Sequence, residues 1–214
     1  MIILLNGIDG SGKTTIGDKF KELGIPQIKS FTTKPKEESD GDDYIRGEVG
    51  ELMEETEIDG EVYGTPLSEI YKIFNNKFAY KIVDKKGANF FRKKFNAKTI
   101  VLSPPLATIE KRLSKRGMTT EEINKIHANK EDIEAEEFDL KLTREENPER
   151  ICQMCLGLFG YALRGNRLLR VKKRYWTFST YIKGLSGVGY DASRYYRDWF
   201  KTFNFEVVDD DFSR

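Results

Sequence analysis

The chain has few of the residues on which metal centres and disulfide frameworks depend. Its 214 residues include 2 cysteines, 1 histidine and 2 tryptophans. Cys152 and Cys155 form a C-x-x-C pair, but there is no second cysteine pair with which to complete a zinc site. The pair lies in the apolar stretch 151–162, which is more typical of a buried segment than of a redox turn. We therefore expect two reduced, packed thiols.

Long apolar runs and a large net charge are also missing. No run is long enough to span a membrane, and the apolar residues 1–5 are too few for a signal peptide. The net charge of +1 argues against a bulk polyanion as the partner of the whole chain. The length fits one domain, with or without an elaboration. We expect a cytoplasmic globular protein without a membrane partner, and the sequence leaves a homodimer open.

What the chain does have is a glycine-rich turn directly after an apolar run. Residues 7–14 read G-I-D-G-S-G-K-T and follow I-I-L-L at residues 2–5. The glycines permit turn conformations that most side chains forbid, and the loop amides can then converge on phosphate oxygens at a helix N-terminus. The pattern predicts an ATP-binding loop made of Gly7, Asp9, Gly10, Ser11, Gly12, Lys13, Thr14 and Thr15.

Two side chains of this loop have the chemistry of phosphoryl transfer. Lys13 would reach the β- and γ-phosphates and is a predicted catalytic residue. The hydroxyl of Thr14 would be a ligand of Mg²⁺. The sequence thus predicts ATP as the phosphoryl donor and Mg²⁺ as the cofactor.

The hydrophobic pattern alternates strands with helices. This alternation predicts an α/β fold with a parallel sheet that binds its ligand at the carboxyl ends of the strands. Strands are expected at residues 2–5, 25–30, 61–63, 78–83, 98–102, 138–142 and 203–208. Helices are expected at residues 12–23, 51–57, 67–75, 87–95, 105–117 and 121–136.

Four further motifs make residues 1–146 resemble the guanylate kinase family. S-F-T-T-K-P-K-E-E-S-D-G-D-D-Y at residues 30–44 is similar to that family's S-x-T-T-R-x-x-R-x-G-E-x-x-G-x-D-Y. V-Y-G-T at 62–65 resembles Y-Y-G-[ST], and I-V-D-K-K-G at 82–87 resembles L-D-x-D-x-Q-G. I-E-K-R-L-S-K-R-G at 109–117 resembles the x-x-x-R-L-x-x-R-G that leads into the family's lid. Each motif is weak alone, but four in order after a phosphate loop are specific.

The resemblance implies a P-loop NTPase fold, with a three-layer parallel sheet. A nucleoside monophosphate (NMP)-binding insertion would lie at about residues 30–80 and a lid at about residues 114–127. The implied activity is ATP-dependent phosphoryl transfer to an NMP, either a GMP- or dGMP-like nucleotide or a modified dNMP.

The acceptor residues follow from the motif positions. Two lysines and a tyrosine would hold the acceptor phosphate, while a Glu, a Thr and an Asp match the family's guanine-reading residues. Carboxylates can accept from guanine N1–H and its 2-amino group. The expected acceptor residues are Ser30, Lys34, Lys36, Tyr44, Glu54, Tyr63, Thr65 and Asp84. The alternative is a solvated charged loop for the lysines and a surface helix for Glu54.

Arg112 and Arg116 are four residues apart, so they share one face of the expected helix. Their place before the lid makes them predicted catalytic residues, because guanidinium groups there would stabilise charge on the transferred phosphoryl group. The alternative is an exposed basic helix face.

The departures from the family pattern fall mostly in the acceptor half. Lys34 replaces an arginine, Ile82 replaces an aspartate and Lys86 replaces a glutamine, while two missing residues leave the position of Lys36 approximate. The arginine expected after the lid could be replaced only by Lys125, His127 or Lys130. The acceptor therefore need not be GMP.

Residues 147–214 form an expected C-terminal extension of basic and aromatic character. They contain 12 basic and 7 acidic residues and 14 of the 26 aromatic residues. The extension either packs on the core or offers aromatic rings and cations to a nucleic-acid base. The run concerned comprises Tyr161, Arg164, Arg167, Arg170, Lys172, Lys173, Arg174, Tyr175, Trp176 and Phe178.

Two alternatives to a mononucleotide kinase remain. One is a P-loop kinase that phosphorylates a modified base hydroxyl, such as that of 5-hydroxymethyluracil, in DNA contacted by this extension. The other is a non-enzymatic guanylate-kinase-like binding module. The intact Lys13-Thr14 pair argues against the second alternative, because such modules have a degraded phosphate loop.

Overall fold

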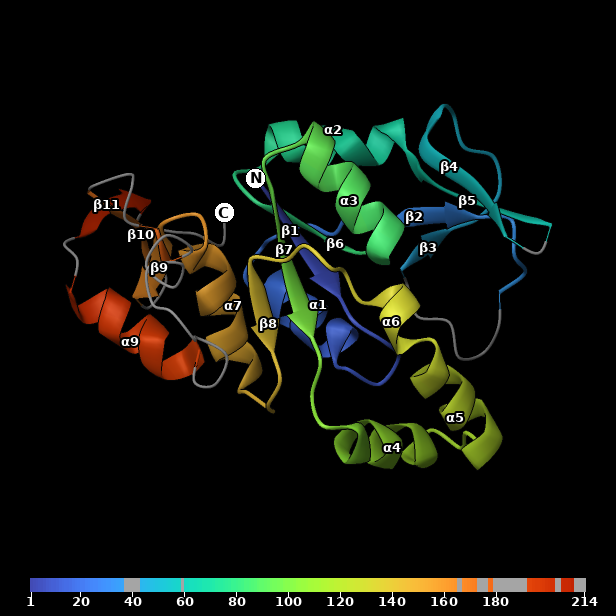
Figure 1. Cartoon of the computed structure of the whole chain (residues 1–214). Coiled ribbons are helices and arrows are strands. Elements are labelled where there is room, and N and C mark those ends of the chain that lie inside the picture. The colour runs from blue at the N-terminus through green and yellow to red at the C-terminus, as the bar shows by residue number, and fades with distance from the viewer. Residues whose placement is uncertain are drawn as a thin grey trace.

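The core of the computed structural model is a parallel sheet with strand order β6-β1-β7-β8 (Figure 1). The model describes residues 1–36, 43–58, 60–164, 167–172, 177–178, 192–202 and 205–209. The four strands are β1 (Ile2–Asn6), β6 (Ala79–Ile82), β7 (Ala97–Leu102) and β8 (Leu140–Leu142). All pairs in the sheet are parallel, and every residue of β1 is buried, as expected for a central strand covered on both faces.

Helices cover both faces of this sheet, which confirms the expected three-layer fold. Alternate residues of β1 point to opposite faces. Ile3 and Leu5 pack in the cluster that includes α1 (Lys13–Glu22) and α7 (Pro148–Gly157). Ile2 and Leu4 pack in the cluster that includes α2 (Leu67–Asn75) and α3 (Lys85–Lys94).

A separate sheet stands beside the core, at the right of Figure 1. It has strand order β3-β2-β5-β4, formed by β2 (Ser30–Thr32), β3 (Tyr44–Ile45), β4 (Leu52–Ile58) and β5 (Glu61–Pro66). The strand expected at 25–30 is shorter, since Gln27 makes only an isolated parallel bridge to Tyr80 and β2 begins at Ser30. The turn expected at residues 40–42 lies outside the described residues.

The helix expected at residues 51–57 is wrong, because this segment forms β4. Its glutamates and Met53 favour a helix locally, but antiparallel pairing with β5 supplies a ladder of backbone hydrogen bonds that overrides that preference. The register shifts between Met53 and Thr56, and within this irregularity Glu54 adopts a φ of 58°. The bulge hides the alternating pattern from which a strand would be predicted.

The lid region consists of α4 (Leu106–Lys115), α5 (Thr120–Ala128) and the short α6 (Lys130–Ile133). Thr119 and Glu122 form a capping box at the start of α5, as the sequence suggests. The single helix expected at 121–136 is interrupted at Asn129, which ends α5 and precedes α6. Asn6 connects the return segment to the core, because its side chain bonds Ile133 O (2.9 Å), Val83 O (3.0 Å) and Ala135 N (2.8 Å).

The extension continues the core and does not stand apart from it. After α7 it forms an antiparallel sheet of order β11-β10-β9, from β9 (Tyr161–Arg164), β10 (Arg167–Val171) and β11 (Phe205–Asp209), with α9 (Ala192–Thr202) packed nearby. The ring of Phe78 in the core lies 5.2 Å from that of Tyr161. One apolar cluster thus includes residues on both sides of position 146, and the domain boundary there stays a prediction.

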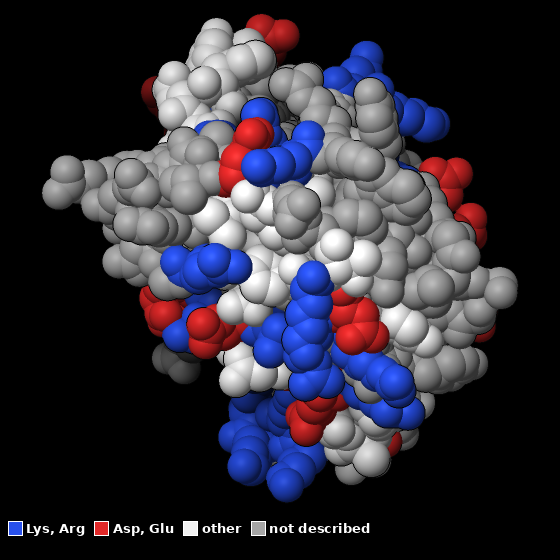
Figure 2. Space-filling view, turned by 90° about the vertical axis from the view of Figure 1, so that its left-hand side faces the viewer, with Lys and Arg blue, Asp and Glu red and all other residues white. Residues whose placement is uncertain are grey.

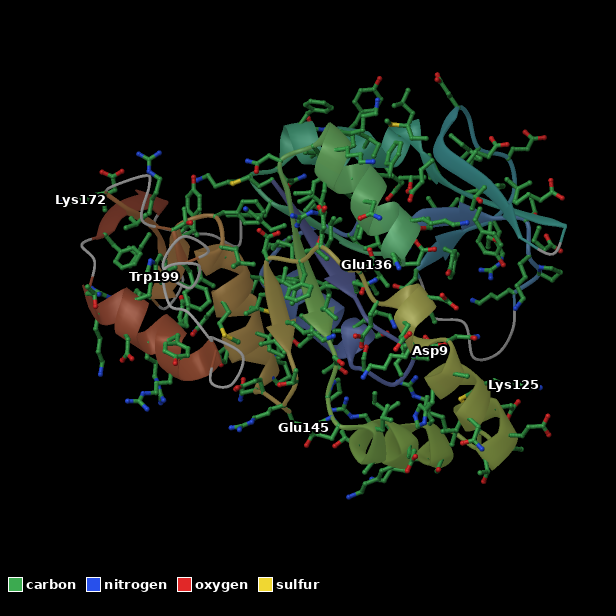
Figure 3. The ribbon with its side chains drawn as sticks, viewed as in Figure 1. Asp9, Lys125, Glu136, Glu145, Lys172 and Trp199 are labelled. Carbon is green, nitrogen blue, oxygen red and sulfur yellow. The ribbon has the colours of Figure 1, made fainter. Side chains whose placement is uncertain are left out.

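Aromatic residues of the extension point inward. Phe178 and Trp199 are fully buried and Tyr196 is 3% exposed, with ring centroids 5.4–5.8 Å apart. Figure 3 shows Trp199 inside the extension and Lys172 at its outer edge. On the outer face, basic side chains are interspersed with acidic ones (Figure 2). Lys173, Arg174, Tyr175 and Trp176 of the predicted basic aromatic run lie outside the described residues.

Both cysteines are buried in α7 and are not bonded to each other. Burial raises the pKa of Cys152 to about 12 and that of Cys155 well above its ordinary value, so both thiols stay protonated near neutral pH. None of the helices in the described ranges combines the length and apolar character that crossing a membrane requires.

Candidate active site

The loop after β1 has the backbone geometry of an anion cradle. Gly7, Gly10 and Gly12 all have positive φ, at 141°, 77° and 106°. A Cβ atom at Gly7 would overlap the carbonyl oxygen of Leu102 on the neighbouring strand, so only glycine fits there. Gly12 is the N-cap of α1, and the loop amides therefore sit at the positive end of a helix.

Lys13 places its ammonium group over this loop. Its Nζ donates to Gly7 O (2.7 Å) and Ile8 O (2.9 Å) and lies 3.5 Å from Asp9 Oδ1. Burial lowers the pKa of Lys13, while the carboxylate of Asp9 opposes this effect. The side chain of Asp9 is 73% exposed and contacts Lys13 through this ion pair. The cation is thus held where a triphosphate would carry its negative charge.

Two hydroxyls complete the loop. Ser11 is buried, and its Oγ has no hydrogen-bond partner among the described residues, which is unusual for a buried polar atom and marks a position for a ligand. Thr14 is exposed in the first turn of α1, followed by the exposed Thr15. A threonine hydroxyl beside phosphate oxygens is a donor set that suits Mg²⁺, which keeps several water ligands of its own.

Arg112 joins the lid helix to the loop. Its Nη1 donates to Gly10 O (2.9 Å) and its Nη2 to Glu145 Oε1 (2.8 Å), as the position of Glu145 beside α4 in Figure 3 illustrates. Arg116 is the C-cap of α4, and its charge acts on Lys13. The structure therefore brings both predicted arginines to the donor side of the site.

A pocket of about 360 Å³ opens between the phosphate loop, α4 and the segment after β8. The phosphate loop and the arginines that line this pocket were predicted from the sequence, but its other walls were not. The residues that line the pocket are Gly10, Ser11, Gly12, Thr15, Ile16, Leu102, Pro104, Arg112, Lys115, Arg116, Leu142, Arg144, Glu145, Glu146, Pro148 and Ile151. No motif marks the missed residues, since they come together only when the ends of β7 and β8 meet at one sheet edge.

The predicted base-reading residues converge from three elements. Thr65 Oγ1 on β5 donates to Glu54 Oε2 on β4 at 3.4 Å. Asp84 is the N-cap of α3 and accepts a hydrogen bond from Gly87 N (2.7 Å). A Cβ atom at Gly87 would lie 2.7 Å from Glu54 Oε1 and 3.3 Å from Asp84 Oδ1, so the two carboxylates meet over this glycine. The structure thus brings Glu54, Thr65 and Asp84 together.

Glu54 is in an unusual state for a glutamate. Its φ of 58° lies in the left-handed region, which costs on the order of 1 kcal/mol or more for a residue with a side chain. Burial raises the pKa of Glu54 to about 7, with Lys81 lowering it and Asp84 raising it further. Backbone strain and a perturbed carboxylate at one residue are features that cluster at functional sites.

Lys81 is a site residue that the sequence analysis missed. It lies in the middle of β6, is 2% exposed and donates from Nζ to Ser30 Oγ at 2.6 Å. Ser30, a predicted acceptor residue, therefore contacts a buried cation. The sequence carries a signal for Lys81, since it is a lysine inside the otherwise apolar expected strand 78–83. The family pattern has a leucine at this position.

Of the predicted phosphate-holding residues, Tyr44 begins β3, while Lys34 and Lys36 lie in the segment after β2. The rings of Tyr44 and Tyr63 are edge-to-face, 6.4 Å apart. Lys34 O accepts from Arg46 Nε (2.8 Å), and the Arg46 guanidinium lies 5.7 Å from the centre of the Tyr44 ring. Arg46 is a second residue that the sequence analysis missed, although it follows the Asp-Tyr end of the motif by only two positions. Lys36 is exposed at the end of a described range, and no described contact joins it to the site.

The candidates for the missing arginine after the lid pair with acidic residues. Lys125 Nζ lies 3.2 Å from Glu121, and Lys130 Nζ lies 3.8 Å from Glu134. His127 Nδ1 lies 3.8 Å from Glu110 on α4. Figure 3 shows Lys125 on the outside of α5. None of these described contacts reaches the phosphate loop.

A parallel sheet with a phosphate loop after its central strand, a carboxylate-bearing insertion and an arginine-bearing lid defines a P-loop phosphotransferase of the nucleotide kinase class. No family model matches the chain. The chain is 32% identical to the guanylate kinase of Malacoplasma penetrans over 163 residues, which are 67% of this chain and 81% of that protein. It is 30% identical to the guanylate kinase of Bacillus cereus over 175 residues, 72% of this chain and 84% of that protein. The chain belongs to the guanylate kinase family.

Two further matches, one to a protein sequence and one to a solved structure, cover different shares of the proteins concerned. The match to the guanylate kinase of Chlamydia felis, at 34% identity, spans 61% of that protein's length. Among solved structures, guanylate kinase from Anaplasma phagocytophilum aligns with 71% of this chain and 81% of that chain, at 20% identity and a TM-score of 0.46.

Proposed function

We propose that the protein transfers the γ-phosphoryl group of ATP to a guanine-type nucleoside 5′-monophosphate, GMP or dGMP or a modified relative. The observation that carries this proposal is the meeting of the Glu54 and Asp84 carboxylates over Gly87, with the Thr65 hydroxyl bonded to Glu54. β1 and β6 are parallel neighbours, so the phosphate loop after β1 and Asp84 after β6 lie at the same edge of the sheet. Donor and acceptor groups would therefore face each other.

The base-reading chemistry favours guanine over adenine. Guanine presents N1–H and a 2-amino group along one edge, and both can donate to carboxylate oxygens. Adenine has neither donor at these positions and would leave the carboxylates unpaired, which is a strong basis for rejection. Glu54 and Asp84 supply the acceptors, and Thr65 supplies a hydroxyl that can turn toward the exocyclic oxygen of guanine.

The transfer needs positioning and charge stabilisation more than covalent chemistry. On the donor side, the loop amides and Lys13 would hold the triphosphate, and Arg112 and Arg116 would stabilise charge on the transferred group. Thr14 would hold Mg²⁺, which supplies further neutralisation of phosphate charge when bound. On the acceptor side, Tyr44 and the basic residues near it would hold the monophosphate.

Two alternatives receive less support. Phosphorylation of a base in DNA would draw on exposed aromatic rings beside cations, whereas Phe178, Tyr196 and Trp199 are buried. A non-enzymatic binding module would have no need of Lys13 and the glycine geometry of the loop, and both are intact.

The test is a panel of phosphoryl acceptors. ATP with Mg²⁺ is incubated with the protein and each common NMP and dNMP, and with duplex DNA containing 5-hydroxymethyluracil, and products are separated by anion-exchange chromatography. We expect turnover of GMP, dGMP or both, and little or none of AMP. Turnover of the DNA without turnover of any mononucleotide would overturn the proposal.

A further inference from the structure

Lys81 is a lysine buried in the core, with 2% of its surface exposed. Its strand position turns it toward the insertion and α3, where its Nζ lies 5.5 Å from the centre of the Phe91 ring. Within the described part of the chain, the ammonium group makes one hydrogen bond, to Ser30 Oγ at 2.6 Å. Burying a lysine costs several kcal/mol unless anions compensate its charge. Because this free-energy cost must be offset, we expect the buried charge of Lys81 to be paired electrostatically with the carboxylates around it.

Four carboxylates act on Lys81, and two of them accept hydrogen bonds of 2.5–2.7 Å from residues outside the predicted base-reading group. These four are Glu54, Glu69, Asp84 and Asp43. Glu69 accepts from Lys72 Nζ (2.5 Å) and from Lys29 N (2.7 Å). Asp43 accepts from the side chain of Gln27 at 2.6 Å.

The remaining two carboxylates are those that meet over Gly87. Asp84 accepts the amide hydrogen of Gly87 at the start of α3. Among the described residues, Glu54 accepts only a long hydrogen bond, from Thr65 Oγ1 at 3.4 Å. Glu54 is therefore the carboxylate whose ionisation depends most on the charge of Lys81, and it is faced by Asp84, which opposes that ionisation.

We propose that Lys81 is a positioning residue of the acceptor site, which keeps the Glu54 carboxylate ionised and orients the Ser30 hydroxyl, so that Glu54 can accept the N–H groups of the acceptor base. This inference rests on the proposed function for the identity of the acceptor. Burial lowers the pKa of Lys81 to about 8, and its charge in turn lowers the pKa of Glu54. We therefore expect acceptor binding to be sensitive to the loss of either charge.

The first experiment measures GMP binding by calorimetry from pH 6 to pH 9 in the wild type and in Lys81→Met, which keeps the length of the side chain without its charge. An opposite charge nearby shifts a carboxyl pKa by about 1–3 units, so the pH midpoint should rise by about that amount and the Kd at pH 7 by about 5- to 500-fold. The shift should appear in the affinity for GMP, with the affinity for ATP unchanged. An unchanged midpoint and unchanged Kd for GMP would overturn the inference.

Lys98→Met is the matched control. Lys98 is a strand lysine on β7 that pairs with the buried Asp139 at 2.9 Å and lies outside the proposed site. Asp139 keeps Arg92 as a partner, so the variant should fold. It should leave the pH midpoint and Kd for GMP unchanged; a shift like that of Lys81→Met would mean that any lost ion pair has this effect.

A second measurement does not depend on the acceptor. The carboxyl carbon of Glu54, labelled with ¹³C and assigned with Glu54→Gln, is titrated by NMR in the wild type and in Lys81→Met without nucleotide. A higher midpoint in the variant supports the inference, and an equal midpoint overturns it. If the wild type phosphorylates no nucleotide, the proposed function fails while this titration still decides the role of Lys81.

A double variant covers the case in which Lys81→Met fails to fold. Lys81→Met with Glu54→Gln removes both charges, and it should recover stability in urea relative to Lys81→Met alone, because no unpaired carboxylate remains buried. Strictly additive losses of stability would contradict the pairing.

Discussion

The donor and acceptor sides of this molecule are built from different materials. The donor cradle is mostly backbone: six consecutive residues, 7–12, three of them glycines with positive φ, bend between β1 and α1. The acceptor side is mostly side chains, with Ser30, Glu54, Thr65, Lys81 and Asp84 supplied by segments far apart in sequence. A backbone cradle tolerates little change, whereas a side-chain pocket can be altered one residue at a time. The family departures indeed fall mostly on the acceptor side.

The largest expected effect comes from the donor side. Lys13→Ala should lower kcat by at least about 10²–10³-fold, because it removes the cation that neutralises the transferred phosphate. The urea midpoint should change little, since Lys13 bonds only to loop carbonyls and to the exposed Asp9. Steady-state kinetics and a urea titration check both parts, and retained activity would refute the donor assignment.

A pair of glycine variants tests whether the donor cradle is fixed by backbone geometry. Gly7→Ala and Gly60→Ala both place a side chain at positive φ, but only at Gly7 would the Cβ meet other atoms, beginning with Leu102 O. Gly7→Ala should lose about 1–3 kcal/mol more unfolding free energy than Gly60→Ala and should bind ATP more weakly. Equal losses in urea denaturation would mean that the close approach to Leu102 is unimportant.

On the acceptor side, Glu54→Gln should raise the KM for GMP by about 10- to 100-fold and leave the KM for ATP unchanged. In the wild type, kcat/KM for GMP should rise with pH through about 7, because the ionised carboxylate accepts the base N–H groups and its pKa is raised to about 7. The variant should lack this rise. A wild-type profile that is flat between pH 6 and pH 8 would contradict the role of Glu54.

The same carboxylate predicts how stability depends on pH. Glu54 binds a proton more tightly in the folded protein than in the unfolded chain. Its stabilising contribution to the unfolding free energy is therefore present below about pH 4.5 and is lost as pH rises through about 7. The unfolding free energy of Glu54→Gln should lack this loss. Urea titrations at pH 5 and pH 8 in both proteins measure it, and an identical pH response in the two proteins would be the contrary result.

The smallest effect is expected at the rim of the donor pocket. Arg112→Met should raise the KM for ATP by about 3- to 10-fold and also lower kcat, because it removes the bond to Gly10 O and one of the two guanidinium groups proposed to stabilise the transferred phosphoryl group; the effect stays small because the side chain is 37% exposed. Glu145→Gln is the control, because it keeps the bond to Gly10 O and removes only the exposed ion pair. It should change the KM for ATP by less than about twofold. Equal effects of the two variants would assign the contribution to the ion pair.

The same contrast explains what could be predicted from the sequence. Residues 7–14 are contiguous, so the loop, α1 and the central strand followed from local pattern. Glu54 was predicted as a reader of the base but in a helix, because its bulge and its pairing with β5 depend on contacts outside the segment. Lys81 and Arg46 were missed because their roles arise from burial and from neighbours on other strands. The packing of Trp199 likewise depends on tertiary contacts that composition does not reveal.

The most direct test of the two-sided site uses one ligand that spans it: adenosine and guanosine joined through their 5′ positions by a pentaphosphate chain. Calorimetry should give one molecule bound per chain, with an affinity at least about 100-fold above that for GMP, since both halves bind at once. Lys13→Ala and Glu54→Gln should each weaken this binding. An affinity no greater than that for ATP, with Glu54→Gln indistinguishable from the wild type, would contradict the account.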